Sequence, residues 1–324
     1  MARIPPPVAA VRMAVRRGLA DIGEDALVLV ACSGGADSLA LASAARFSRR
    51  RVGLVTVDHG LQEGSDRRAR SVAAWARDAG FDPVRIETVS VAGLPGGPEA
   101  AARTARYEAL AGAAAEAGAA AVLLGHTRDD QAETVLLALA RGAGPRGLSG
   151  MPGRRGIYRR PLLDVARADT RKACAALGLA PWEDPHNTDP AYARSRVRAS
   201  VLPALVDALG PAVLGNLART ASLVAADNEA LDGLSAVALE SARSAAGLSV
   251  PVLAGLSAAI RGRVLHRWAR ELGAPGGALA YAHVVALDAL VTGWHGQGPV
   301  FLPAGIGVAR RSDDLVRVVP ANIS

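Results

Sequence analysis

Residues 27–38 read Leu-Val-Leu-Val-Ala-Cys-Ser-Gly-Gly-Ala-Asp-Ser, and this stretch decides the fold. The apolar run 27–31 predicts a short buried strand, because Ser33-Gly34-Gly35 ends it abruptly. A helix is expected to follow from Asp37. Glycines at such a turn let the backbone approach a phosphate, and the free N–H groups at the helix start can hold it. The stretch predicts a phosphate-binding loop, with a plain tight turn as the alternative.

Strand and helix patterns alternate on the C-terminal side of this loop. Further strand patterns lie at 52–57, 84–89 and 120–124, and helix patterns lie at 66–79, 98–117 and 128–140. This alternation predicts an α/β fold, a doubly wound parallel sheet covered by helices on both faces. Ligands of such folds bind at the carboxyl ends of the strands. The loop lacks the Walker spacing GxxxxGK[ST] and the dinucleotide-binding spacing GxGxxG, which excludes both of those folds' phosphate motifs.

The rest of the chain has a different pattern. Residues 141–156 are rich in Gly, Pro and Arg and predict a mobile basic loop, followed by a helix near 166–178. A helical segment covers about 212–246, and helical patterning from Val250 gives way after 293 to β-like runs at 299–302 and 306–319. We expect a catalytic domain over 1–211, a linker helix over 212–249, and a small α+β C-terminal domain over 250–324.

Composition limits the class of protein. Hydrophobic residues make up 50% of the 324 residues and charged residues 21%, which is typical of a globular chain. The net charge of +7 is nearly all arginine, since Lys172 is the only lysine. Such a surface suits a polyanionic partner, although GC-rich coding produces the same bias.

Cellular location is indicated by what the sequence lacks. Cys32 and Cys174 are the only cysteines, so neither a disulfide framework nor a cysteine zinc site is predicted. The N-terminus has no unbroken apolar core of a signal peptide, and no segment reaches the roughly 18 apolar residues of a membrane span. We expect a soluble, cytoplasmic protein with no membrane partner.

The motif Ser33-Gly34-Gly35-Ala36-Asp37-Ser38, in its strand-to-helix context, resembles the SGGxDS signature of the PP-loop ATP pyrophosphatases. Members of that superfamily cleave ATP to AMP and pyrophosphate. The resemblance implies that all six residues bind ATP and that Ser33, Gly34, Gly35, Asp37 and Ser38 hold its pyrophosphate. Cys32 is then expected to be a small buried strand residue.

Four further stretches resemble the tRNA(Ile)-lysidine synthetase family within that superfamily. They are Val57-Asp58-His59-Gly60-Leu61-Gln62, Glu99 to Tyr107 (ExxARxxRY), Gly125 to Thr134 (HxxDDxxET), and Trp182 to Arg198, with Pro161-Leu162-Leu163 between the last two. Three residues depart from the family pattern: Gln62, His186 and Ser195. A looser similarity covers about 250–318 and includes Arg263 to Trp268 and Leu302-Pro303-Ala304-Gly305.

The stretch 125–134 has the densest chemistry. If it is helical, His126, Asp130 and Glu133 share one face. Thr127 and Asp130 can instead form a capping box at the helix start. A zinc site at this spacing would need more ligands than the stretch offers, so no protein metal site is predicted. A cationic substrate group suits the two carboxylates better.

The resemblance implies a two-step reaction and a role for each matching residue. ATP activates the wobble cytidine of a minor isoleucine tRNA with a CAU anticodon, and lysine then displaces AMP, with Mg²⁺ accompanying the nucleotide. Val57 and His59 would bind ATP with the loop, Asp130 and Glu133 would bind lysine, and Arg106 and Arg194 would bind tRNA. The expected catalytic residues are Asp37, Arg103, His126 and Arg198. A homodimer is possible.

Two other functions compete with this one. A PP-loop tRNA thiolase would deliver sulfur instead of an amine, but such enzymes use cysteine pairs, and here only Cys32 and Cys174 exist. A noncatalytic protein that binds ATP and tRNA is the alternative of a different class. Pyrophosphate release and lysine consumption would separate these possibilities.

Overall fold

The computed structural model of the chain describes residues 4–49, 51–60, 64–90, 98–183, 189 and 191–318. The chain forms two compact units, Met1–Ala225 and Ala226–Ser324. No single helix in the described ranges is long and apolar enough to cross a membrane. Within the described ranges, one pair of consecutive helices, Ala193–Leu209 and Ala212–Ala242, would be long and apolar enough if taken together, but the pair bends by 104° at its break.

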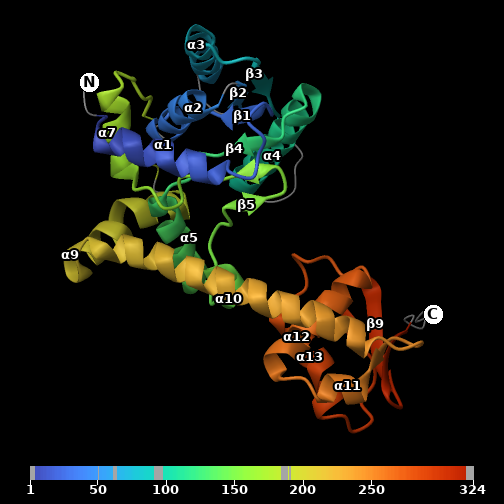
Figure 1. Cartoon of the computed structure of the whole chain (residues 1–324). Helices are drawn as coiled ribbons and strands as arrows, with labels where there is room; N and C mark the ends of the chain where they lie inside the picture. Colours follow the sequence, from blue (N-terminus) through green and yellow to red (C-terminus); the bar gives the residue numbers. More distant parts are fainter. Residues whose placement is uncertain are drawn as a thin grey trace. The chain divides into compact units, whose positions relative to one another are not determined.

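The first unit is built on a six-stranded sheet in the order β3-β2-β1-β4-β6-β5 (Figure 1). Its strands are β1 (Val28–Ala31), β2 (Val52–Asp58), β3 (Val84–Thr88), β4 (Ala121–Leu123), β5 (Arg154–Arg155) and β6 (Tyr158–Arg159). All pairings are parallel except that of β5 with β6. The predicted α/β class with a parallel sheet is therefore confirmed, with one antiparallel edge strand in addition.

Helices cover both faces of this sheet. The helices of this part of the chain are α1 (Pro6–Gly18), α2 (Ala36–Ser48), α3 (Ser65–Asp78), α4 (Pro98–Ala117), α5 (Arg128–Ala140), α6 (Pro145–Leu148) and α7 (Arg167–Ala176). Alternate residues of β1 point to opposite faces, because side chains alternate along a strand. Val28 and Val30 join the core formed with α1, α2, α3 and α7, whereas Leu29 and Ala31 join the core formed with α4 (Figure 1).

The chain reverses its strand order between β1 and β4. From β1 it proceeds outward through β2 to β3 and then returns to the other side of β1, where β4 pairs in parallel. Parallel strands that neighbour each other at such a switch point leave a crevice beyond their carboxyl ends. The two loops meet there at close range, because a Cβ atom on Gly125 would lie only 3.2 Å from the backbone N of Ser38. The order of the strands thus places the phosphate loop and the 125–134 motif together.

One local prediction was wrong in part. Residues 141–156 were expected to form a loop, but α6 and β5 lie within this range, and β6 follows it. A four-residue helix and a two-residue strand are too short to show a period in the sequence. The β4–β6 pairing, Val122 with Tyr158, then extends the sheet beyond the last strand that the hydrophobic pattern indicates.

After α7 the first unit continues with short helical segments. These are α8 (Ala193–Arg196), the π-helical turn η2 (Val197–Val201), α9 (Leu202–Leu209) and the beginning of α10 (Ala212–Ala242). The division between the two compact units falls inside α10. The three-part division at 211 and 249 stays a prediction.

The second unit combines helices with a small antiparallel sheet. Its elements after α10 are β7 (Leu248–Ser249), α11 (Val250–Ala254), α12 (Ala258–Glu271), α13 (Tyr281–Thr292), β8 (Val300–Leu302), the 3-10 turn η3 (Pro303–Gly305), β9 (Ile306–Arg311) and β10 (Asp314–Val318). The sheet order is β7-β10-β9-β8. Leu265, Trp268 and Leu287 are buried in a core shared by the helices and the sheet. The expected α+β character of this region is confirmed.

Gly53 of β2 offers a test of this packing. A Cβ atom there would lie 2.7 Å from the carbonyl oxygen of Pro83 and 2.5 Å from Leu29 Cδ2, so Gly53→Ala overpacks the sheet. We expect the free energy of unfolding in urea to fall by about 1–3 kcal/mol. Gly112→Ala is the matched control, because nothing lies within 4 Å of its Cβ position in α4, and it should stabilise by about 0.5–1 kcal/mol. Equal effects of the two substitutions would contradict the packing described.

Candidate active site

The phosphate loop links β1 to α2 through a turn that only glycine fits well. Gly34 has φ 86°, and a Cβ atom there would lie 2.9 Å from Val72 of α3. Ser38, in the first turn of α2, donates a hydrogen bond to the carbonyl oxygen of Gly35 at 2.9 Å and accepts one from the N–H of Ser33 at 3.3 Å. These two hydrogen bonds hold the loop against the start of α2, where the free N–H groups favour the binding of an anion.

A cavity of about 360 Å³ opens beside this loop, and we call it the phosphate-loop cavity. Its lining includes Ser33, Gly35, Ala36, Asp37, Ser38, Arg106, His126, Asp130, Arg167 and Arg198. These residues come from α2, α4, the loop after β4, α5, α7 and η2. The structure thus brings together the phosphate loop and the 125–134 motif, which lie far apart in the sequence.

A second cavity of about 290 Å³, which we call the β2-end cavity, adjoins the first. Val57 and His59 line it, together with Thr56 and Ser65. Ser33, Gly35 and Arg106 line both cavities, so the two spaces meet at the phosphate loop. Arg106 was expected to contact tRNA, and its position between the cavities is one that sequence spacing does not indicate.

Asp37 is a half-buried carboxylate in the lining of the phosphate-loop cavity. It accepts a hydrogen bond from the hydroxyl of Thr170, and the guanidinium of Arg167 lies 3.6 Å from its Oδ2 atom. Burial raises the pKa of Asp37 to about 6, although Thr170 and Arg167 oppose this shift. A further cation close to this carboxylate would therefore stabilise its charged form.

Asp130 and Glu133 lie on α5 and are held by arginines from two other elements. Arg167 Nη2 lies 2.7 Å from Asp130 Oδ1, and Arg167 Nη1 lies 3.2 Å from Glu133 Oε1. Arg198 binds Glu133 with two hydrogen bonds, from Nε at 2.8 Å and from Nη2 at 3.0 Å. Glu133 is 0% exposed, so its charge requires these partners. We call Asp37, Asp130, Glu133, Arg167 and Arg198 the carboxylate–arginine cluster.

The capping role of Asp130 is confirmed. Its Oδ2 atom accepts hydrogen bonds from the backbone N–H of Thr127 at 2.7 Å and from the Thr127 hydroxyl at 2.8 Å. The helix begins at Arg128, so His126 precedes it and does not share a helical face with Asp130 and Glu133. His126 and Asp130 nevertheless line one cavity, because the loop after β4 turns toward the phosphate loop.

Two histidines in the cavities are held neutral. Burial, with the positive charge of Arg106 next, lowers the pKa of His126 to about 3 and also lowers the pKa of His59. The Nδ1 atoms of both rings are buried without a hydrogen-bond partner. A bound group could therefore supply a partner to either ring without meeting an imidazolium charge.

Arg103 and Arg194 lie at the margin of the site. Arg103 is exposed on α4, where its guanidinium lies 5.1 Å from the centre of the Tyr107 ring, and it is not among the described lining residues of either cavity. Arg194 donates to the hydroxyl of Thr134 at 2.9 Å and lies 3.5 Å from Glu133 Oε2. Gln62, His186 and Asn187 lie outside the described residues, as does the side chain of Glu99.

Three residues of the site were missed by the sequence analysis. Arg167 and Thr170 follow Pro161-Leu162-Leu163 on α7 and contact Asp37, and Trp182 lines both cavities. Asp129 also has a partner that the sequence does not reveal, because its Oδ2 atom accepts the backbone N–H of Arg167 at 2.8 Å. Nothing in local spacing connects these residues. A search for arginines near the Pro-Leu-Leu motif could have suggested Arg167.

The described part of the chain contains no group of three or more His, Cys, Asp or Glu side chains that could hold a metal ion. Asp37 is the cluster carboxylate nearest the phosphate loop, since it lies in the first turn of α2. A hard cation such as Mg²⁺ commonly uses one or two carboxylates together with substrate phosphates. The raised pKa of Asp37 fits such a role, because a nearby cation would favour its charged form.

The fold and the phosphate loop define a PP-loop ATP-binding protein: residues 11–205 match the PP-loop domain family. Residues 248–316 match the TilS substrate binding domain. The chain is 65% identical to tRNA(Ile)-lysidine synthase of Salinispora arenicola over 99% of both chains, and 56% identical to that of Thermobifida fusca over 97% of this chain and 98% of that one. The chain belongs to the tRNA(Ile)-lysidine synthase family.

A solved structure shares the fold at low identity. The U34-tRNA thiolase NcsA from Methanococcus maripaludis, with its 4Fe-4S cluster, has a TM-score of 0.55 and 16% identity, covering 67% of this chain and 80% of that chain. This likeness concerns the fold alone.

The raised pKa of Asp37 gives a pH-dependent stability. A carboxyl whose pKa is higher in the folded state binds more protons there, so stability falls as pH rises between about 4 and 6. Asp37→Asn should therefore raise the free energy of unfolding at pH 7 by at most about 3 kcal/mol, as the shift of about two pKa units sets the limit. Near pH 3.5 the gain should vanish. Urea unfolding at both pH values measures it, and a variant that is less stable than the wild type at pH 7 would contradict the assignment.

Proposed function

We propose that the chain ligates lysine to C2 of the wobble cytidine of a minor isoleucine tRNA with a CAU anticodon, consuming ATP and releasing AMP and pyrophosphate. The observation that carries this proposal is the cavity whose lining joins the phosphate loop to Asp130, Arg167 and Arg198 of the carboxylate–arginine cluster. The loop suits a polyphosphate, and the cluster offers carboxylates for an ammonium group. The family of the chain supports the same reaction.

ATP would occupy both cavities. Its β- and γ-phosphates would lie against Ser33, Gly34, Gly35, Ala36 and Ser38, where N–H groups and hydroxyls can hold them. Its adenosine would extend into the β2-end cavity, beside Val57 and His59. The lining shared by the cavities includes Arg106, which would then lie near the α-phosphate, whose phosphorus atom reacts.

Mg²⁺ would be held by Asp37 together with the phosphates of ATP. When bound, it supplies positive charge that offsets the charge developing on the departing pyrophosphate. The arginines of the phosphate-loop cavity would add to this. Arg106 and Arg198 both line that cavity, so their guanidinium groups can bind phosphate oxygens as the leaving group separates.

The reaction would proceed in two steps. The O2 atom of cytidine attacks the α-phosphorus of ATP, and the bond to pyrophosphate breaks. The ε-amine of lysine then attacks C2 of the adenylated base, and AMP leaves with the former O2 atom. His126 would hold the base in place as a neutral hydrogen-bond partner, since the lowered pKa keeps it uncharged near neutral pH. Arg103 is proposed to approach from the rim of the site.

Asp130 and Glu133 would bind the α-ammonium of lysine rather than its ε-amine. A nucleophilic amine must be unprotonated, and the ordinary pKa of the ε-amine is about 10.4. A neighbouring carboxylate would raise that pKa further. Holding the other end leaves the ε-amine extended toward the base. Arg194, which contacts Glu133, is proposed to border the tRNA.

The second unit, with its match to a substrate binding domain, is proposed to hold tRNA outside the catalytic cavity. A cytoplasmic location and a homodimeric state are further proposals, the first because isoleucine tRNA is found there and the second because many enzymes form symmetric dimers.

The deciding experiment is incorporation of labelled lysine into minor isoleucine tRNA in the presence of ATP. We expect lysine to enter the tRNA only when both ATP and tRNA are present. A sulfur-transferring enzyme would incorporate no lysine, and a noncatalytic binder would release no pyrophosphate. Cys32 and Cys174 are both buried, and burial raises the pKa of both thiols, which disfavours the sulfur alternative.

Substitution in the carboxylate–arginine cluster should separate the two steps. Asp130→Asn should raise the KM for lysine strongly, because a neutral amide no longer pairs with the α-ammonium. Pyrophosphate exchange that requires tRNA but not lysine should remain within about threefold of the wild type. If this variant instead stops the exchange and keeps the lysine KM, the pair serves the nucleotide.

Arg167 should couple the binding of lysine to the binding of pyrophosphate. Without ligands it is bound to Asp130 and Glu133, the carboxylates that lysine would need. Pyrophosphate would attract Arg167 toward the phosphate loop and leave those oxygens for the ammonium. We expect saturating pyrophosphate to tighten lysine binding at least about fivefold in calorimetry, and lysine must tighten pyrophosphate binding equally.

Arg167→Gln should remove this coupling and bind lysine more tightly than the wild type when pyrophosphate is absent. Glu133 keeps both of its hydrogen bonds from Arg198 in this variant, so the fold should persist. Arg171→Gln is the control, because Arg171 lines the same cavity but pairs with Glu183. Unaltered coupling in Arg167→Gln would show that Arg167 plays no such part.

A further inference from the structure

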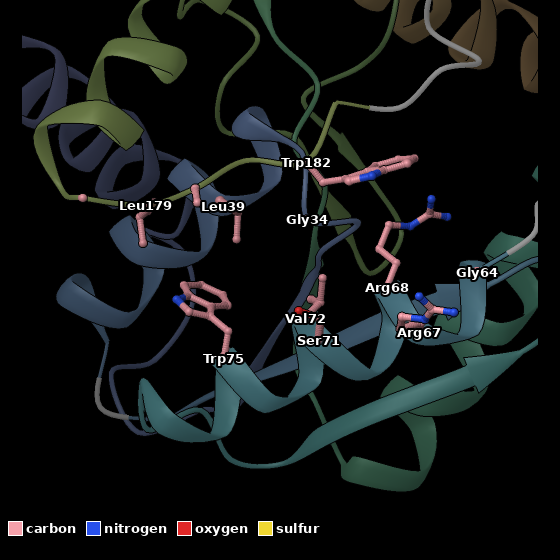
Figure 2. A pocket seen from close by; sticks show the side chains of 12 residues that line it. Gly34, Leu39, Gly64, Arg67, Arg68, Ser71, Val72, Trp75, Leu179 and Trp182 are labelled. Carbon is pink, nitrogen blue, oxygen red and sulfur yellow. The ribbon is translucent and has the colours of Figure 1, made fainter.

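A third cavity of about 870 Å³ lies beside the site, and the proposed reaction assigns it no role. We call it the α3 groove. It runs between α3 and the segment 178–182, and Gly34 of the phosphate loop is among its lining residues. Figure 2 shows the side chains of Arg68 and Trp75 rising from α3 toward that segment, where Leu179 and Trp182 lie.

The lining of the groove combines flat aromatic surface with positive charge. Trp75 and Trp182 supply the indole rings, Arg67 and Arg68 supply guanidinium groups, and Ser71 supplies a hydroxyl. None of the described residues that line the groove is a carboxylate. Aromatic faces with arginines suit a ligand that has both a planar ring and an anionic group, which is the chemistry of a nucleotide.

The groove is continuous with the two catalytic cavities through Trp182. The backbone N–H of Trp182 donates to the carbonyl oxygen of Gly34 at 2.9 Å, so the phosphate loop holds the backbone of this residue. Trp182 lines all three cavities. The guanidinium of Arg68 lies 3.9 Å from the centre of the Trp182 ring, and Arg68 lines the β2-end cavity as well. If one nucleotide of an RNA chain enters the catalytic cavities, the neighbouring nucleotides would therefore pass Trp182 and the α3 groove.

We propose that the α3 groove binds a nucleotide of the tRNA anticodon loop that is adjacent to the reacting cytidine. Its base stacks on the indole ring of Trp75, and its phosphate contacts Arg67. The proposal rests on the proposed function, because it requires RNA as the substrate. Single-stranded loops are the part of RNA whose bases can separate and stack on aromatic side chains and arginine planes.

ATP itself is a less suitable occupant of the groove. The β2-end cavity already adjoins the phosphate loop and offers Thr56, Val57 and His59 to an adenosine. The groove, by contrast, lies on the other side of Trp182, along the exposed side of α3 where Arg67 and Ser71 face solvent. A long exposed trough suits a chain that continues beyond the site more than it suits a compact nucleotide.

The first test compares two arginines on one helix. Arg67 lines the groove, whereas the exposed Arg70 does not and pairs instead with Asp66. Affinity for the anticodon stem-loop of the minor isoleucine tRNA is measured for Arg67→Gln and Arg70→Gln across a series of salt concentrations. Arg67→Gln should lower the slope of log affinity against log salt by about 1, and Arg70→Gln should leave it nearly unchanged. Equal slopes in the two variants overturn the phosphate contact.

The second test locates the stacked base. Stem-loops that are abasic immediately before or immediately after the target cytidine are bound to the wild type, to Trp75→Leu and to Ser71→Glu. One of the two abasic RNAs should bind the wild type about tenfold more weakly, and this loss should shrink in Trp75→Leu. Ser71→Glu keeps the packing of Trp75 against Phe81 and places a negative charge in the groove, so it should weaken every stem-loop.

The outcomes separate this proposal from the proposed function. If the groove variants raise the KM for ATP and leave RNA affinity intact, the groove belongs to the nucleotide and the proposal is wrong. If they alter neither quantity while the wild type still incorporates lysine, the groove has no part in RNA binding. If the wild type incorporates no lysine, the proposed function itself fails.

Discussion

The buried carboxylate of Glu133 is the constraint on which the rest of the site depends. It is 0% exposed, and an unpaired charge in such a place would cost several kcal/mol. Arg198 and Arg167 supply the compensating charge from η2 and α7. Leaving Glu133 without any guanidinium partner would break a buried ion pair, which typically costs about 3–5 kcal/mol. The need to pair one side chain thus fixes three elements of the first unit against one another.

The same cluster reaches the phosphate loop through Asp37. Arg167 lies between Asp37 and the pair on α5, so the region that suits phosphates and the region that suits an ammonium group share one guanidinium. The cluster combines three carboxylates with two guanidinium groups, so a polyanion and a cation disturb its charge balance in opposite senses. Neutral His126 and His59 add no charge of their own. The site is therefore suited to binding two oppositely charged substrates together.

Much of the first unit could be predicted because its signals are local. The apolar run 27–31, the Ser-Gly-Gly turn and the cap formed by Thr127 and Asp130 each depend on a few neighbouring residues, and each is found where the pattern places it. Periodicity also gave α5 its bounds, 128 to 140. Where a residue and its partner are close in sequence, propensity and spacing determine the structure.

The partners of the arginines could not be predicted in this way. Arg167 meets Asp130 across 37 residues, and Arg198 meets Glu133 across 65, so no local period links them. The position of Arg106 between two cavities likewise depends on how α4 packs on β2 and β4. The short β5 and β6 escaped detection because the pairing of β6 with β4 and of β5 with β6, rather than their own composition, makes them strands. Tertiary contact decided each of these features.

The central claim is that the cytidine O2 atom attacks the α-phosphate and later departs with AMP. The most direct test uses minor isoleucine tRNA that carries ¹⁸O at O2 of the wobble cytidine, with unlabelled ATP, lysine and water. Mass spectrometry of the AMP formed in one turnover measures the label. The account predicts one ¹⁸O atom in each AMP and none left on the modified base. Unlabelled AMP formed together with the lysine-bearing base would contradict it.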